Sequence, residues 1–390
     1  DGVDLPPLRT KRRGPAWPTP PPRADCRTAT PTSREDAIGL ARLLDSRYSS
    51  LERRPSGPPW SAKRCPSPRK RSCVELRLTG DDPLGALISG LDGIGRASLG
   101  PNGVRLDGLK SALPDLKALH KMVGLRALKR DIVDQIAYYA QGFNSRGKSE
   151  DYLHTVIYGP PGTGKTDVAK LLGSIFCKLG ALPGSGFYKA CRSDLVAGYL
   201  GQTAIKTRAV IDAALGGVLF IDEAYALGNS DKIDSFAKEC IDTLCEALSV
   251  HRGSLMVVIA GYEEALEKCF FAYNPGLRSR FVWRYGTDKY SSEELGQMFA
   301  GKVKECGWEL CMEDRRVASW FGRHANAFTG YGRDVDSLLT KTKIAHARRV
   351  FGSGDTCMHL TEEDLDAGLE LFKRNKDRVG PPGPPLSMYS

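Results

Sequence analysis

The sequence predicts an α/β protein in which helices cover a parallel sheet, followed by a small all-helical domain. Three observations support this fold class. Short apolar segments with the character of strands alternate with helical segments between residues 154 and 285, and such alternation favours parallel pairing. A glycine-rich turn joins the first of these strands to a helix. After Ser291 the strand pattern stops and only helical periodicity continues.

The composition excludes several classes of protein. Of 390 residues, 41% are hydrophobic and 26% are charged, which argues against a fibrous or wholly disordered chain. The 11 cysteines form no C-x-x-C pair and no histidine lies at zinc-ligand spacing, so neither a disulfide framework nor a structural metal is expected. No apolar run reaches the roughly 18 residues that cross a bilayer. We expect no membrane association and a cytoplasmic location, with a plastid as the alternative.

Residues 1–108 are expected to form a disordered tail that ends in a linker. Residues 1–73 carry +9 of the net charge of +10 and 13 of the 24 prolines, without a sustained helical or strand period. A single helical stretch is possible over residues 34–51. The basic tail is compatible with a targeting peptide, although its acids at positions 1, 4, 35 and 36 fit one poorly. Residues 90–108 are glycine-rich and are interpreted as the linker, and residues 379–390 as a second, Pro-rich tail.

The folded part is expected to begin at Leu109, with a helical period that continues to about Ala140. Its apolar face is formed by Leu125, Leu128, Ile132 and Ile136. Strands are then expected at residues 154–158, 186–190, 218–222, 255–260 and 281–285. Helices are expected at residues 292–306, 315–326, 334–351 and 361–374. These patterns predict an α/β domain over residues 109–290 and a helical domain over residues 291–378.

The turn after the first strand matches the phosphate-binding pattern G-x-x-x-x-G-K-T. It consists of Gly159, Pro160, Pro161, Gly162, Thr163, Gly164, Lys165 and Thr166. Between a strand and a helix, such glycines let backbone N–H groups turn toward phosphate oxygens at the positive end of the helix. We expect Lys165 to reach the β- and γ-phosphates of ATP and the Thr166 hydroxyl to ligate Mg²⁺.

Two acids, Asp222 and Glu223, end the apolar segment Val218–Ile221. A buried parallel strand delivers the residues at its carboxyl end to the edge of the sheet where ligands bind. We expect Asp222 to hold Mg²⁺ and Glu223 to orient and activate the attacking water. A small-molecule kinase or a switch GTPase needs no such glutamate, and no guanine-reading N-K-x-D sequence occurs, so hydrolysis of ATP is favoured.

Further motifs follow in order along the chain. They are Ser193-Asp194-Leu195, Tyr199-Leu200-Gly201-Gln202-Thr203, Asp222-Glu223-Ala224-Tyr225, Ala260-Gly261-Tyr262 and Asn274-Pro275-Gly276-Leu277 with Ser279-Arg280. Together with the phosphate-binding loop, this series resembles the AAA+ ATPases of the CbbX (red-type Rubisco activase) and stage V sporulation protein K group, over about residues 115–350. The resemblance implies a P-loop ATPase domain with a helical lid, assembled as a homohexameric ring with ATP between subunits.

The resemblance also implies roles for individual residues. Arg280 matches the arginine finger that reaches into the neighbouring subunit's site, with Arg278 as a competitor. Arg333 matches the sensor-2 arginine at the start of a lid helix, although Gly-Tyr-Gly-Arg stands where the family tends to have Gly-Asn-Ala-Arg. Residues 122–125 resemble the linker that packs on adenine. Tyr262 falls at the sensor-1 position, and no role is assigned to it.

Tyr199, Leu200 and Gly201 match the loop that lines the central pore in this family. An aromatic followed by an aliphatic residue and a glycine, on a polar loop, suits non-specific gripping of an extended peptide. The resulting hypothesis is a motor that hydrolyses Mg-ATP and pulls a protein client through its pore. Two alternatives stay open: a nucleic-acid motor or clamp loader, which the nearly neutral core disfavours, and a scaffold that binds nucleotide without hydrolysing it.

Overall fold

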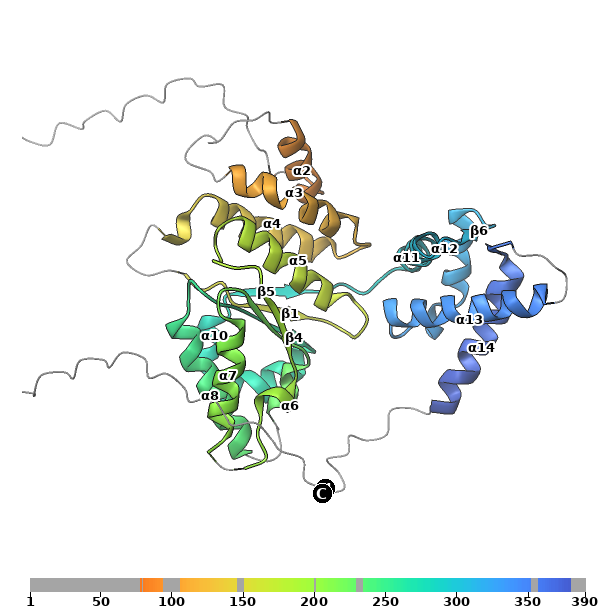
Figure 1. Cartoon of the computed structure of the whole chain (residues 1–390). Helices are drawn as coiled ribbons and strands as arrows, with labels where there is room; N and C mark the ends of the chain where they lie inside the picture. Colours follow the sequence, from red (N-terminus) through yellow and green to blue (C-terminus); the bar gives the residue numbers. More distant parts are fainter. Residues whose placement is uncertain are drawn as a thin grey trace, which may run out of the picture. The chain divides into compact units, whose positions relative to one another are not determined.

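The computed structural model describes residues 78, 80–93, 106–145, 151–199, 201–228, 234–351 and 357–379 (Figure 1). The predicted tails up to residue 77 and from residue 380 onward, the possible helix over residues 34–51 and the pore-loop residue Leu200 lie outside this range. In the part of the chain that is described, no helix combines the length and the apolar character that a membrane span requires.

A five-stranded parallel sheet forms the centre of the α/β domain. Its strands are β1 (Thr155–Tyr158), β2 (Phe187–Ala190), β3 (Val218–Ile221), β4 (Met256–Gly261) and β5 (Trp283–Gly286), in the order β2-β3-β4-β1-β5. All neighbours are parallel. The predicted parallel sheet is therefore confirmed. Because β1 and β3 lie on either side of β4, their carboxyl ends meet at one edge of the sheet.

Helices cover both faces of this sheet (Figure 1). One face carries α2 (Pro83–Gly93), α3 (Leu106–Lys121), α4 (Arg126–Ala140) and α5 (Lys165–Lys178). The other carries α6 (Arg192–Leu195), α7 (Thr203–Ala214), α8 (Ser235–Val250), α9 (Glu263–Leu266) and α10 (Gly276–Arg280). Short helical turns are η2 (Phe143–Ser145), η3 (Ala224–Leu227) and η4 (Glu267–Phe271).

Strand β3 shows why its sequence is apolar throughout. Val218 and Phe220 pack into the core beneath α2–α5, whereas Leu219 and Ile221 pack into the core on the opposite face. Side chains alternate along a strand, so a strand covered on both faces has no position for a polar residue. The strand becomes polar only where it leaves the sheet, at Asp222.

The structure differs from the sequence prediction at the start of the domain. Helix α2 lies within the segment interpreted as tail and linker, and its Leu84, Leu87 and Leu91 are buried. Their i, i+3, i+7 spacing gives a single apolar stripe, but it is short and runs directly into glycines. The helical period over residues 109–140 is also two helices, α3 and α4, because Gly124 and Leu125 both adopt left-handed backbone angles, with φ of 67° and 56°.

The C-terminal domain, here called the lid, is helical as predicted. It contains α11 (Ser292–Glu305), α12 (Asp314–Arg323), α13 (Gly332–Val350), α14 (Glu362–Val379) and the short turn η5 (Ala325–Ala327) around its own apolar core. Two strands of two residues each, β6 (Glu309–Leu310) and β7 (His359–Leu360), pair in parallel. This pairing was not predicted, because two residues are too few to show a period.

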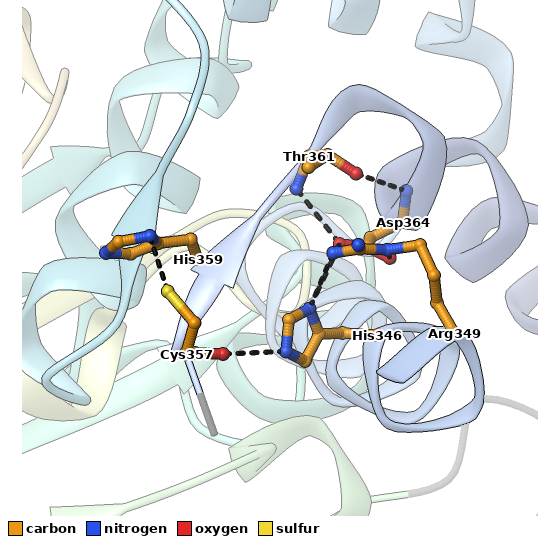
Figure 2. A network of polar contacts seen from close by, with 6 residues as sticks. All are labelled: His346, Arg349, Cys357, His359, Thr361 and Asp364. Atoms are coloured by element: carbon orange, nitrogen blue, oxygen red, sulfur yellow. Dashed lines mark hydrogen bonds and ion pairs between the residues drawn. The ribbon is translucent and has the colours of Figure 1, made fainter. Parts of the chain in front are cut away.

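A buried polar network joins α13 to α14 (Figure 2). Arg349 donates from Nε and Nη2 to the two carboxylate oxygens of Asp364 at 2.8 and 2.9 Å, and the backbone N–H of Thr361 donates to the same carboxylate. His346 donates from Nε2 to the carbonyl of Cys357 at 2.9 Å. Burial by itself raises the pKa of Asp364, but the hydrogen bonds from Arg349 and Thr361 outweigh it and lower the pKa to about 2.

Candidate nucleotide-binding site

A cleft of about 790 Å³ lies at the carboxyl edge of the sheet and reaches the lid. Its walls come from the α3–α4 junction, the phosphate-binding loop, the ends of β3 and β4, the segment after β5 and the lid, and Tyr262 at the predicted sensor-1 position is part of the lining. Residues from these parts include Met122, Val123, Gly162, Lys165, Thr166, Asp222, Glu223, Tyr290 and Arg333. Segments separated by more than 200 residues in the sequence therefore meet in one cavity of a size that suits a nucleotide.

The phosphate-binding loop turns directly into α5, as its sequence predicts. Gly164 precedes the helix with a left-handed φ of 82°, and Lys165 is the first helical residue. The ammonium group of Lys165 donates to the carbonyl oxygens of Gly159 at 2.8 Å and Pro160 at 2.7 Å. Burial lowers the pKa of Lys165, and the nearby carboxylates of Asp222 and Glu223 oppose this effect. Lys165 is thus positioned at the loop with its charge satisfied by neutral oxygens.

The loop contacts the lid through backbone atoms at Gly162. The backbone N–H of Gly332 donates to the carbonyl of Gly162 at 3.1 Å. A Cβ atom at Gly162 would lie 2.1 Å from the carbonyl oxygen of Gly330, and the φ of 78° also disfavours a side chain. Only glycine permits this close approach, which places the start of α13 and its Arg333 beside the loop.

The two acids after β3 differ in their surroundings. Asp222 accepts a hydrogen bond from the ammonium of Lys189 on β2 at 3.1 Å. Glu223 has a left-handed backbone with φ of 50°, which is unusual for a residue with a Cβ and turns the chain from β3 into η3. The cleft-lining Asp222 and Thr166 are oxygen donors that could hold Mg²⁺, and a cationic group already lies beside Asp222.

Three tyrosines, Tyr225, Tyr262 and Tyr290, also line the cleft. Burial, the Glu223 carboxylate and a hydrogen bond with that carboxylate raise the pKa of Tyr225 to about 12, so its phenol stays protonated and available as a donor. Its ring centroid lies 6.1 Å from that of Tyr262. Tyr290, in the segment that leads into the lid, donates from its hydroxyl to the carbonyl of Thr163 at 3.2 Å.

The predicted arginine finger, its competitor and the described residues of the predicted pore loop do not line this cleft. Arg280 donates to Ser249 Oγ at 2.8 Å and to the carbonyl of Gly276 at 2.7 Å, and it is not part of the cleft lining. Arg278 forms an ion pair with Glu267 at 2.6 Å. Tyr199 is 74% exposed, so its ring does not pack on its own domain. Gly201 beside it has a φ of 76°.

Sequence reasoning missed Lys189, Tyr225 and Tyr290 as parts of the site. Tyr225 was visible within the acidic motif, but a tyrosine two residues after an acid carries no specific signal. Lys189 is the single charge in β2, and only the order of strands reveals that β2 lies next to β3. Tyr290 reaches the loop only because the chain after β5 passes over it.

Comparison with known proteins identifies the relatives of this chain. Residues 155–285 match the ATPase family associated with various cellular activities (AAA). A cfxQ-like protein of Acanthamoeba polyphaga mimivirus is 38% identical over 275 residues, covering 70% of this chain and 67% of that protein. The chromosomal CbxX protein of Cupriavidus necator is 32% identical, covering 67% of this chain and 86% of its own length. Stage V sporulation protein K of Bacillus subtilis is 36% identical, covering 60% and 70%.

These relatives belong to the family group that the ordered motifs indicate, and the family model covers the sheet domain from β1 to β5. The match includes the phosphate-binding loop and the acids after β3, which the structure brings together in one cleft. The chain therefore belongs to the AAA ATPases, in the group of the CfxQ and CbxX proteins and stage V sporulation protein K, and is an ATP hydrolase.

Proposed function

We propose that the chain hydrolyses Mg-ATP at the interfaces of a homohexameric ring and uses the energy to remodel a protein client drawn through the central pore. One observation supports this more than any other. The phosphate-binding loop, the acids after β3 and the lid arginine line a single cleft. A site that joins two domains in this way can convert the state of the nucleotide into a change of the angle between them.

The residues of the cleft have distinct proposed roles in hydrolysis. Lys165 moves from the loop carbonyls to the β- and γ-phosphates, a rearrangement that its present hydrogen bonds to neutral oxygens allow. Thr166 and Asp222 would hold Mg²⁺, which when bound neutralises charge on the β- and γ-phosphate oxygens. Glu223 accepts the proton of the attacking water. Arg333 contacts the γ-phosphate from the lid.

Arg280 is the proposed arginine finger of the neighbouring subunit. Within its own chain it is bound to a hydroxyl and a carbonyl, neither of which is charged. Arg278, in contrast, is paired with the carboxylate of Glu267. Moving Arg278 to a phosphate would break an ion pair, whereas moving Arg280 breaks only neutral-acceptor hydrogen bonds. This difference supports Arg280 over Arg278.

Tyr199 is the proposed contact to the client. Its ring is largely exposed, and an exposed aromatic side chain on a loop offers an apolar surface to side chains of an extended peptide. Leu200 and Gly201 complete the same loop.

The proposal is tested with Glu223→Gln in the full chain. Loss of the carboxylate should retain ATP binding and reduce turnover by about 10² to 10⁴-fold, the usual contribution of a general base. Glu246→Gln is the control, because Glu246 is a surface acid paired with Arg208 and lies outside the cleft. Proteins captured by the ATP-bound Glu223→Gln ring are then identified by mass spectrometry.

The outcomes separate the candidate functions. Wild-type turnover in Glu223→Gln would reject Glu223 as the base. Absence of ATP turnover in the native chain would favour the nucleotide-binding scaffold. Steeply salt-dependent DNA binding, with no captured protein, would favour the nucleic-acid motor.

A further inference from the structure

Lys189 does not line the cleft but pairs with Asp222, which does, and the proposed hydrolysis gives Lys189 no role. It lies on β2 opposite Phe220 of β3, and its Nζ atom lies 5.9 Å from the centroid of the Phe220 ring. Its ammonium group is 3.1 Å from Oδ2 of Asp222. Because Phe220 packs beneath α5, Lys189 approaches Asp222 from the face of the sheet that carries the phosphate-binding helix.

We propose that Lys189 is a built-in counter-ion that occupies the Asp222 carboxylate when no metal ion is bound, so that Lys189 and Mg²⁺ compete for this carboxylate. This inference rests on the proposed role of Asp222 in holding Mg²⁺. The charge of Lys165 also acts on Asp222, but its ammonium group is hydrogen-bonded to the loop carbonyls, whereas that of Lys189 forms the ion pair with the Asp222 carboxylate. The lysine of β2 therefore has a function at the site that is separate from that of the loop lysine.

Lys189 is placed so that it can leave. Its side chain is 52% exposed, against 30% for that of Asp222, so the ammonium group can move into water without crossing the protein interior. Exposed ion pairs of this kind shift an equilibrium by about two- to fivefold. The ion pair between Lys189 and Asp222 is thus strong enough to change the affinity for a divalent ion but too weak to prevent its binding.

The competition has a defined consequence for nucleotide binding. Without Lys189 and without Mg²⁺, the phosphates of ATP meet a carboxylate of Asp222 that has lost its ion-pair partner, and their mutual repulsion weakens binding. With Mg²⁺ present, Asp222 is neutralised by the metal and no lysine has to be displaced. Removing Lys189 should therefore make nucleotide binding more dependent on Mg²⁺.

The test measures the dissociation constant of a fluorescent, non-hydrolysable ATP analogue in EDTA and in saturating Mg²⁺, using the full chain. The ratio of the two constants expresses the metal dependence. Lys189→Ala should raise this ratio about two- to fivefold relative to the wild type, and Lys189→Arg, which keeps the charge, should restore it. Lys117→Ala is the matched control, because Lys117 forms a similarly exposed ion pair with Asp92 at 2.9 Å, outside the cleft.

A second comparison localises the effect to Asp222. In an Asp222→Asn background, Lys189→Ala should leave the ratio unchanged, because the carboxylate for which Lys189 and Mg²⁺ compete is absent. An equal ratio in Lys189→Ala and Lys117→Ala would overturn the inference, as would a Lys189 effect that persists in Asp222→Asn. If the wild type itself binds the analogue equally well in EDTA and Mg²⁺, the assignment of Mg²⁺ to Asp222 fails, and the inference fails with it.

Discussion

The backbone contact between Gly162 and the lid predicts an unusually severe effect of the smallest possible side chain. In Gly162→Ala the new Cβ would lie 2.1 Å from the carbonyl oxygen of Gly330, whereas ordinary contacts begin at 3.4 Å, so loop and lid must separate by about 1 Å. The left-handed φ of 78° adds about 1–2 kcal/mol, and overpacking about 1–3 kcal/mol. The free energy of unfolding should fall by about 2–5 kcal/mol.

Gly307→Ala separates strain from contact. Gly307 has nearly the same φ, 74°, but nothing lies within 4 Å of the position of its Cβ, so only the backbone cost of about 1–2 kcal/mol should appear. Denaturant unfolding measures both losses, and ATP turnover measures function. A displacement of about 1 Å at the site can reduce turnover by up to about 100-fold, which we expect for Gly162→Ala alone. Equal effects of the two variants on stability and turnover would refute the contact as the cause.

Three further outcomes are expected. The pKa of Asp364 is lowered from 3.8 to about 2, which implies about 2 kcal/mol of stability that is present above about pH 4 and is lost as the pH falls toward 2. Asp364→Asn should be less stable than the wild type at neutral pH, and its free energy of unfolding, measured with denaturant, should fall less between about pH 4 and pH 2. An unchanged fall over this range would contradict the prediction. Arg280→Ala should lower ATP turnover about 10³-fold, with recovery when it is mixed with Lys165→Ala, whereas Arg278→Ala should lose only a surface ion pair; no recovery on mixing would count against action across the interface. Tyr199→Ala should impair remodelling of the captured client far more than ATP turnover, and equal losses would indicate a structural tyrosine.

The fold was predictable where short-range patterns carry the information. The phosphate-binding loop between Gly159 and Lys165 was recognisable from its motif, and the strand before Asp222 from its continuous apolar run. Helix α2 was missed because its stripe of Leu84, Leu87 and Leu91 ends in glycines and needs α3 and α4 to become a core. The two-residue strands β6 and β7 have no period at all, and they exist only because the lid helices bring them together.

The site was predictable in its phosphate-binding part and incomplete elsewhere. Asp222 and Glu223 follow a strand whose end must lie beside the loop, so local sequence is sufficient to place them. Lys189 could not be placed, because its partner depends on which strand neighbours β3. Tyr290 could not be placed either, since its hydrogen bond to Thr163 spans 127 residues of sequence and depends on the path from β5 to the lid.

The left-handed backbone of Glu223 has a consequence for any attempt to engineer this protein. A residue with a Cβ and a φ of 50° raises the energy of the folded state by about 1–2 kcal/mol, a penalty that glycine would avoid. Optimisation of the chain for thermostability alone would therefore favour glycine at position 223. The resulting protein would unfold at a higher temperature but would lack the carboxylate proposed to activate water. Thermal stability and ATP turnover therefore place opposite demands on this residue.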